Sequence, residues 1–142
     1  MKKVTIYTDG ACAGNPGPGG YGVILVYGNS RKELSGGEKH TTNNRMEMMG
    51  VIKGLEALKG PCEVDVYSDS RYVVDAVEKK WAEKWRMNGW WRKKGPALNP
   101  DLWETLLNLL ALHKAKFYWI KGHAGHPENV RCDTLARYAI PN

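Results

Sequence analysis

Apolar and polar residues alternate over the first part of the chain, which is the pattern of strands with one buried face. Val4 and Ile6, for example, alternate with polar neighbours in a segment that ends at Asp9. Turn-forming residues are concentrated over 14–20 and separate the first two alternating segments. We therefore predict an antiparallel three-stranded meander, with strands at residues 3–10, 21–27 and about 31–41.

From Thr42 onward the apolar period lengthens to that of a helix. Thr42 and Asn43 are candidate N-caps, and a Gly-Pro pair at 60–61 favours the end of this helix. A strand is then expected over 63–69, again ending in an acidic residue. The apolar positions with helical spacing are Met48, Val51, Ile52, Leu55 and Leu58.

The second half of the chain continues the alternation of helices and strands. Ser70 can cap a helix, and Asn99 precedes Pro100, a residue favoured at the first helical position. The remaining expected elements are a helix carrying Tyr72–Val77, a helix from Pro100 to about Leu112, a strand over Lys116–Ile120 and a helix from Glu128 to about Ala139.

This order of elements predicts an α/β protein built on a mixed five-stranded sheet. Three antiparallel strands are followed by βαβ crossovers, and helices flank the sheet. The strand over 63–69 should be parallel to the first strand, so that Asp9 and Asp69 both emerge at the carboxyl ends of strands. Open α/β sheets bind their ligands at those ends. With 142 residues, 42% of them apolar, we expect a single domain over residues 1–142.

Several features bear on where the protein acts. No stretch approaches the roughly 18 consecutive apolar residues of a membrane-spanning helix, and the N-terminal residues lead into a strand rather than a signal peptide. We expect a cytoplasmic monomer that contacts no membrane and needs no obligate protein partner. The three cysteines, at positions 12, 62 and 132, form no CxxC pair, which predicts buried, reduced thiols.

The net charge of +6 is concentrated in one segment. Between Lys79 and Lys94, seven basic residues stand against one acidic residue, and the rest of the chain is neutral. The same segment holds four of the six tryptophans: Trp81, Trp85, Trp90 and Trp91. We interpret residues 79–98 as a substrate-binding excursion from the domain. The competing interpretation is a buried tryptophan stripe, which is strongest for Trp81, whereas binding is favoured for Trp85 and Trp90.

Four acidic residues are expected to approach one another in space. Glu47 lies one turn into the first predicted helix and Asp133 one turn into the last, where both can join Asp9 and Asp69. Each acid alone has an ordinary structural explanation, as a turn residue, a helix cap or a charge at a helix start. Together they would repel one another unless a cation intervened, and oxygen ligands favour Mg²⁺ or Mn²⁺. Two ions about 4 Å apart suit phosphodiester hydrolysis, because they can activate water and stabilise the leaving oxygen.

Four long motifs carry a resemblance to a known family. They are TDGACAGNPGPGGYG at 8–22, TTNNRMEMMG at 41–50, YSDSRYVVDAV at 67–77 and KGHAGHPENVRCDTLA at 121–136. Together with the basic tryptophan-rich segment, they span nearly the whole chain in order, and they resemble bacterial type I ribonuclease H. The resemblance implies a ribonuclease H-like fold. It also implies an endonuclease that cuts the RNA strand of RNA/DNA hybrids with two metal ions, leaving 5′-phosphate and 3′-hydroxyl ends.

The resemblance assigns roles to individual residues. It makes Asp9, Glu47, Asp69 and Asp133 metal-binding catalytic acids, and His123 a loop histidine that assists proton transfer or product departure. The candidate substrate-binding residues are Asn15, Thr42, Asn43, Asn44, Lys84, Trp85, Arg86 and Trp90. Amide side chains suit recognition of 2′-hydroxyls, and the Thr42 hydroxyl suits a DNA phosphate as well as a helix cap. Two positions depart from the family pattern: Arg71, where glutamine is common, and His40, where arginine is often found.

Two other functions compete with this one. A catalytically silent hybrid-binding module would keep the basic surface and lose one or more acids, but all four acids are present. An integrase-like or resolvase-like nuclease of the same broad fold would act on DNA alone. The asparagine cluster and the KGHAGHPEN segment disfavour that alternative.

Overall fold

A computed structural model describes residues 1–122 and 125–142, and its centre is a five-stranded sheet with the strand order β3-β2-β1-β4-β7. β1, β2 and β3 are antiparallel neighbours, whereas β4 pairs in parallel with both β1 and β7. The predicted meander and parallel crossover are therefore confirmed. The strands of this sheet are β1 (Lys2–Cys12), β2 (Gly17–Tyr27), β3 (Ser30–Thr41), β4 (Cys62–Ser68) and β7 (Lys114–Trp119).

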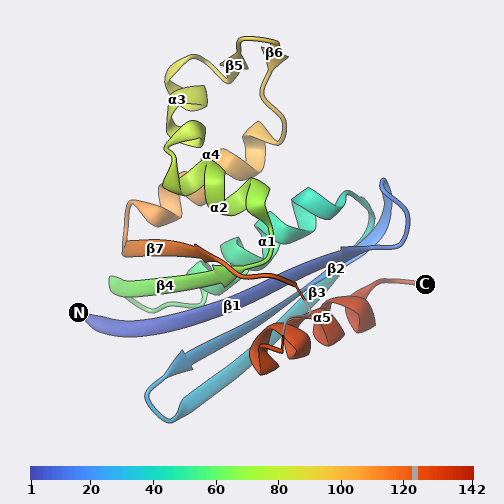
Figure 1. Cartoon of the computed structure of the whole chain (residues 1–142), viewed down its shortest axis with the longest axis vertical. Helices are drawn as coiled ribbons and strands as arrows, with labels where there is room; N and C mark the ends of the chain where they lie inside the picture. The colour runs from blue at the N-terminus through green and yellow to red at the C-terminus, as the bar shows by residue number, and fades with distance from the viewer. Residues whose placement is uncertain (123–124) are drawn as a thin grey trace.

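Helices cover both faces of the sheet (Figure 1). α1, α2 and α4 lie on one side and α5 on the other, while α3 and the small β5–β6 pair project away from the sheet. The helices and the two short strands are α1 (Asn43–Glu56), α2 (Arg71–Glu78), α3 (Trp81–Met87), β5 (Trp91–Arg92), β6 (Gly95–Pro96), α4 (Pro100–Leu110) and α5 (Pro127–Ala139). None of the helices within the described ranges is long and apolar enough to cross a membrane.

The main core lies between the sheet and the helices α1, α2 and α4. The alternating strand residues Ile6 and Val66 are fully buried there, as is Trp103 of α4. The predicted caps of α1 and α2 are confirmed, because the hydroxyls of Thr42 and Ser70 each accept a hydrogen bond at 3.2 Å from the backbone N–H three residues later. Cys62 and Cys132 are buried and Cys12 is partly buried; all three are free.

On the opposite face of the sheet, α5 packs closely against β2 at two glycines. A Cβ atom on Gly20 or Gly22 of β2 would collide with backbone carbonyl oxygens of α5. This explains why the predicted turn over 14–20 was too long. β2 already begins at Gly17, and its glycines serve helix packing as well as chain reversal.

Several predicted boundaries were wrong by a few residues. α1 ends at Glu56, before the Gly-Pro pair at 60–61, and α4 ends at Leu110. In α5, the side chain of Val130 is exposed although it is apolar. The buried residues of α5 are Asn129, Cys132 and Ala136, which face the sheet.

Candidate active site

Three carboxylates from different parts of the chain meet at one end of the sheet. Asp9 comes from β1, Glu47 from α1 and Asp69 from the residue after β4, and one ligand atom of each lies within 4.8 Å of those of the other two. Asp9 and Glu47 are buried, with 5% and 3% of their surface exposed. These three sequence-predicted acids are therefore brought together.

The parallel pairing of β1 with β4 sets the spacing of the two aspartates. Its last pair is Tyr7 with Tyr67, and Asp9 and Asp69 each lie two residues beyond it. The ring of Tyr67 stacks between those of Tyr7 and Tyr118, with centroids 5.3 and 5.0 Å away. The prediction that both aspartates end strands was wrong for Asp9, because pairing with β2 extends β1 to Cys12.

Glu47 reaches the site because α1 approaches β1 closely at Gly10. A Cβ atom on Gly10 would lie 2.6 Å from the Glu47 backbone nitrogen, so only glycine permits this approach. Gly10 donates its backbone N–H to Oε1 of Glu47 and also, at 2.9 Å, to Oδ1 of Asp9. Both residues lie within β1, so the ordinary explanation of Asp9 as a turn residue does not hold.

The electrostatics of the cluster fit a divalent cation. Burial, and then the charge of Asp69, raise the pKa of Asp9 to about 7. Burial, followed by the neighbouring charge of Asp9, raises the pKa of Glu47 well above its ordinary value. The Glu47 Oε2 atom is buried and has no hydrogen-bond partner among the described residues. A cation bound here would keep the acids ionised and satisfy this oxygen.

Asp133 lies at the rim of the same site rather than inside the triad. It belongs to α5 and lines a cleft of about 430 Å³ together with the three clustered acids. Its Oδ2 accepts a hydrogen bond of 3.0 Å from Nε of Arg137, one turn further along the helix. The fourth acid is thus adjacent to the cluster but held by an intrahelical ion pair.

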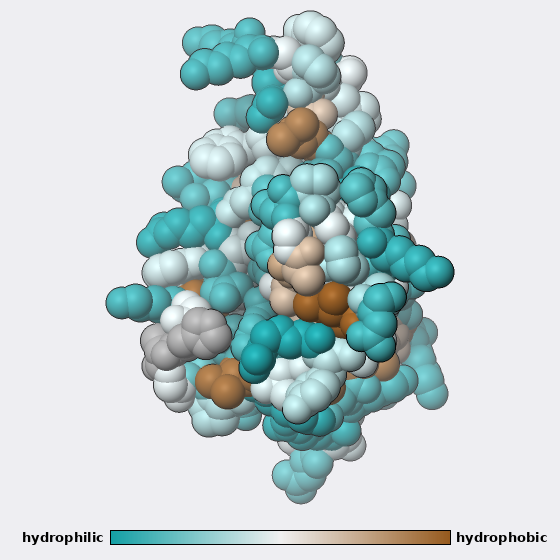
Figure 2. Space-filling view, turned by 90° about the vertical axis from the view of Figure 1, so that its right-hand side faces the viewer, coloured by the Kyte–Doolittle hydropathy of each residue, from teal (hydrophilic) through white to brown (hydrophobic). Residues whose placement is uncertain are grey.

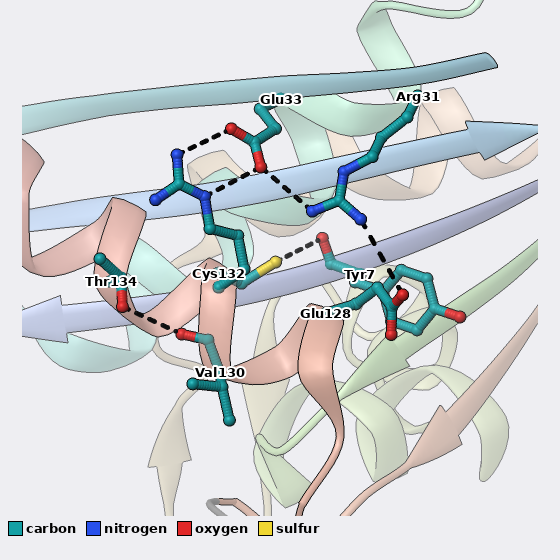
Figure 3. Close-up of polar contacts among 8 residues, drawn as sticks. Tyr7, Arg31, Glu33, Glu128, Val130, Cys132 and Thr134 are labelled. Atoms are coloured by element: carbon teal, nitrogen blue, oxygen red, sulfur yellow. Dashed lines mark hydrogen bonds and ion pairs between the residues drawn. The ribbon is translucent and has the colours of Figure 1, made fainter.

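A polar network fixes α5, and with it Asp133, against the sheet (Figure 3). Arg131 donates two hydrogen bonds of 2.9 Å to Glu33 of β3, and Arg31 contacts the same carboxylate at 3.1 Å. The Arg131 and Arg31 hydrogen bonds lower the pKa of Glu33 to about 2. On the inner side, the Cys132 thiol donates to the backbone oxygen of Tyr7 at 3.3 Å, as Figure 3 also shows.

The candidate amide residues gather beside the acids. Asn43 and Asn44, at the start of α1, line the acidic cleft. Asn15 accepts a hydrogen bond of 3.1 Å from the Asn43 backbone N–H, which joins the β1–β2 turn to α1. Thr42 acts as the α1 cap, so its hydroxyl is engaged by Arg45 N.

The basic excursion forms a separate lobe above α4 (Figure 1). Lys84 is exposed, whereas Arg86 pairs with Glu104 of α4 at 3.3 Å. The half-buried Trp90 packs against the core. Figure 2 shows hydrophilic side chains projecting at the top of the molecule, the end that the β5–β6 segment occupies in Figure 1.

The structure does not support the competing interpretation of a buried tryptophan stripe at Trp81, and it turns Trp85, which was favoured for binding, towards the core. Trp81 is 40% exposed, and Trp85 instead faces inward, edge-on to Trp103 with ring centroids 6.1 Å apart. The helical spacing showed that the two rings share one side of α3, but it did not show which of them α4 covers. Trp85 therefore packs the excursion against α4, and only part of its side chain remains at the surface.

Sequence reasoning did not find three further residues around the site. Arg45 binds Asp101 through two hydrogen bonds of 3.0 and 2.7 Å and thereby joins the starts of α1 and α4. Trp119 donates from Nε1 to the Asp69 backbone oxygen at 3.0 Å. These contacts join residues distant in sequence, so no local pattern signals them. His123 lies outside the described residues.

The sheet order and the carboxylate cluster define an α/β protein with an acidic site suited to divalent metal. The ribonuclease H family model matches residues 1–141, and the chain belongs to this family. It is 66% identical over 137 residues to the ribonuclease H of Desulforamulus reducens, covering 96% of this chain and 86% of that protein. It is 58% identical over 142 residues to the ribonuclease HI of Synechocystis sp., covering 99% and 89% respectively.

Solved structures agree with this assignment. LC9-RNase H1, described as a type 1 RNase H with the type 2 active-site motif, superposes with a TM-score of 0.88 at 33% identity, covering 99% of this chain and 72% of that one. LC11-RNase H1, solved in complex with an RNA/DNA hybrid, gives a TM-score of 0.75 at 26% identity and covers 96% of both chains. The expected ribonuclease H-like fold is confirmed.

Proposed function

We propose that this protein is an endonuclease that hydrolyses the RNA strand of RNA/DNA hybrids and leaves 5′-phosphate and 3′-hydroxyl ends. The observation that carries the proposal is the buried cluster of Asp9, Glu47 and Asp69, with an oxygen of Glu47 that lacks a partner among the described residues. The membership of the ribonuclease H family and the solved hybrid complex of LC11-RNase H1 support the choice of substrate.

The acids would hold the divalent metal that this family uses. We assign Asp9, Glu47 and Asp69 as metal ligands. Asp133 is assigned as a fourth ligand, and to bind the metal its side chain would leave Arg137 and turn towards the other acids. Two Mg²⁺ ions, or Mn²⁺ in their place, would supply water activation and leaving-oxygen stabilisation. Gly10 orients Glu47 by donating its N–H to Oε1, which leaves the second oxygen free. His123 is assigned the assisting role in proton transfer or product departure.

Substrate recognition would use the surfaces on both sides of the cleft. Asn15, Asn43 and Asn44 present amides beside the acids, where they suit the 2′-hydroxyls that distinguish RNA from DNA. The Thr42 hydroxyl accepts the Arg45 backbone N–H as the cap of α1, so it would contact a DNA phosphate by donating its own proton. The excursion over 79–98 would contact the substrate through Lys84, Trp85, Arg86 and Trp90. We propose that this excursion and the rest of the chain form one ribonuclease H domain over residues 1–142.

The central experiment compares RNA/DNA, RNA/RNA and DNA/DNA duplexes of the same length and base sequence, in Mg²⁺ and in excess EDTA. We expect cleavage of the RNA strand in the RNA/DNA duplex alone, and only with the metal. Asp69→Asn should abolish cleavage while binding of the hybrid persists. Cleavage in EDTA, or equal cleavage of the DNA duplex, would contradict the proposal.

We further propose that the protein acts as a monomer in the cytoplasm. The deep placement of the cluster within one chain supports a site that needs no second subunit. Sedimentation equilibrium across a concentration series, together with a fractionation of cells that express the chain, would test both statements. A dimer whose dissociation abolishes activity would contradict the first.

A further inference from the structure

Arg71 is a cation at the rim of the acidic cleft. It is the first residue of α2, its side chain is exposed, and it lines the cleft together with the four acids. Among the described residues that line this cleft, it is the only basic one. A positive charge here lies beside the place where the reacting phosphate would bind.

An aromatic ring holds the guanidinium in place. The Arg71 Cζ atom lies 3.9 Å from the centroid of the Trp119 ring, a close cation–π stack. Trp119 in turn donates from Nε1 to the backbone oxygen of Asp69 at 3.0 Å. The stack is therefore anchored to the same residue that supplies one of the clustered carboxylates.

Arg71 is not a counter-ion of these acids. Within residues 1–122 and 125–142 it forms no ion pair with any carboxylate. Stacking on Trp119 covers a face of the guanidinium group and leaves its N–H groups at the edges available. A planar fork of donors in this state suits bidentate binding of a phosphate.

We propose that Arg71, held by Trp119, binds a phosphate of the RNA strand next to the one that is cleaved. The proposal rests on the function proposed above, because it takes the RNA strand to pass over the acids. The contact would fix the register of that strand over Asp9 and Asp69. In this role Arg71 is a substrate-binding residue, and Trp119 is a positioning residue.

The first test measures equilibrium binding of a hybrid in EDTA over a series of salt concentrations. Arg71→Gln should weaken binding about 10-fold at 0.1 M salt, the scale of one charge-assisted phosphate contact. It should also reduce the log-log salt slope by about one unit or somewhat less. Arg71→Lys should keep the slope but recover only part of the affinity, since it lacks the fork. Trp119→Leu should weaken binding about 3-fold with an unchanged slope, because the charge remains but is less ordered.

A matched control is Lys32→Gln, which removes one exposed cation from β3, at the opposite edge of the sheet from β7. It should leave both affinity and slope unchanged. Equal effects of Lys32→Gln and Arg71→Gln would overturn the proposal, since they would reflect net charge alone. Binding is measured without metal and does not depend on cleavage. A wild-type protein that binds the hybrid but does not cleave it would therefore contradict the proposed function, while the binding of Arg71→Gln could still be compared with that of the wild type.

The second test locates the phosphate. Uncharged methylphosphonate linkages are placed one at a time on either side of the cleavage site in the RNA strand, and binding is measured for each hybrid. One linkage should weaken wild-type binding about as much as Arg71→Gln does, and should weaken the variant no further. Additive losses at every position would overturn the proposal. So would tighter Mg²⁺ binding by Arg71→Gln with an unchanged salt slope, which is the behaviour of a counter-ion.

Discussion

Replacement of Asp9 by asparagine should stabilise the metal-free protein although it destroys the site. The pKa of Asp9 is raised from 3.8 to about 7 by burial and by Asp69. An acid whose pKa is higher in the folded chain weakens the fold when it ionises. The penalty is therefore absent below about pH 4, grows as the pH rises, and is complete somewhat above pH 7.

The magnitude follows from the size of this shift. A rise of about three pKa units corresponds to about 4 kcal/mol at pH 7. Asparagine keeps the shape of Asp9 but still buries an amide, so we expect Asp9→Asn to raise the free energy of unfolding by about 2–4 kcal/mol at pH 7.5. At pH 4 the difference between the two proteins should nearly vanish.

Urea denaturation in EDTA at several pH values measures this difference. The matched control is Asp65→Asn, since Asp65 lies on β4 but is partly exposed and pairs with Lys3 at 3.6 Å. Saturating Mg²⁺ should stabilise the wild type and not Asp9→Asn, because the binding energy belongs to the folded state alone. Equal stabilities of wild type and Asp9→Asn at pH 7.5, or a difference that does not depend on pH, would refute the reasoning.

Three further predictions test the fold and the binding surface. Gly22→Ala should cost about 1–3 kcal/mol or more in urea denaturation, because its Cβ would collide with the backbone oxygen of Cys132 in α5, whereas Gly60→Ala, with open space, should cost far less. Glu33→Gln should be less stable than wild type above about pH 4.5, and the gap should close as the pH falls towards 2, where wild-type Glu33 is protonated too. Neutralising Lys93 and Lys94 together should raise KM for a hybrid and lower its salt slope by about two units or somewhat less, with kcat unchanged within error; an unchanged slope would exclude this part of the excursion from the binding surface.

The fold was predictable wherever one local pattern decided the outcome. The period of two in residues 3–10 identified β1, and the caps at Thr42 and Ser70 placed the starts of α1 and α2 correctly. Errors arose where packing between distant segments decided instead. The glycines of β2 could not be distinguished from turn glycines, because their reason is the approach of α5, more than a hundred residues later.

The site was predictable in its residue types but not in its geometry. The motifs identified the acids, and the structure brings Asp9, Glu47 and Asp69 together. The separate position of Asp133, held by Arg137, depends on how α5 lies over the sheet, which no spacing within the helix specifies. Nor could the sequence show that Trp85, rather than Trp81, faces Trp103, since both lie on one side of the same short helix.

The close approach of α1 to β1 at Gly10 has a consequence for local unfolding. The three clustered ligands belong to β1, α1 and the end of β4, so opening any of these elements removes a ligand from the cluster. A bound cation would therefore oppose each such opening by the part of its binding free energy that the lost ligand supplies. The Gly10 amide donates to Glu47 at this junction. Its hydrogen exchange should therefore be slower in Mg²⁺ than in EDTA, and this measurement needs no substrate.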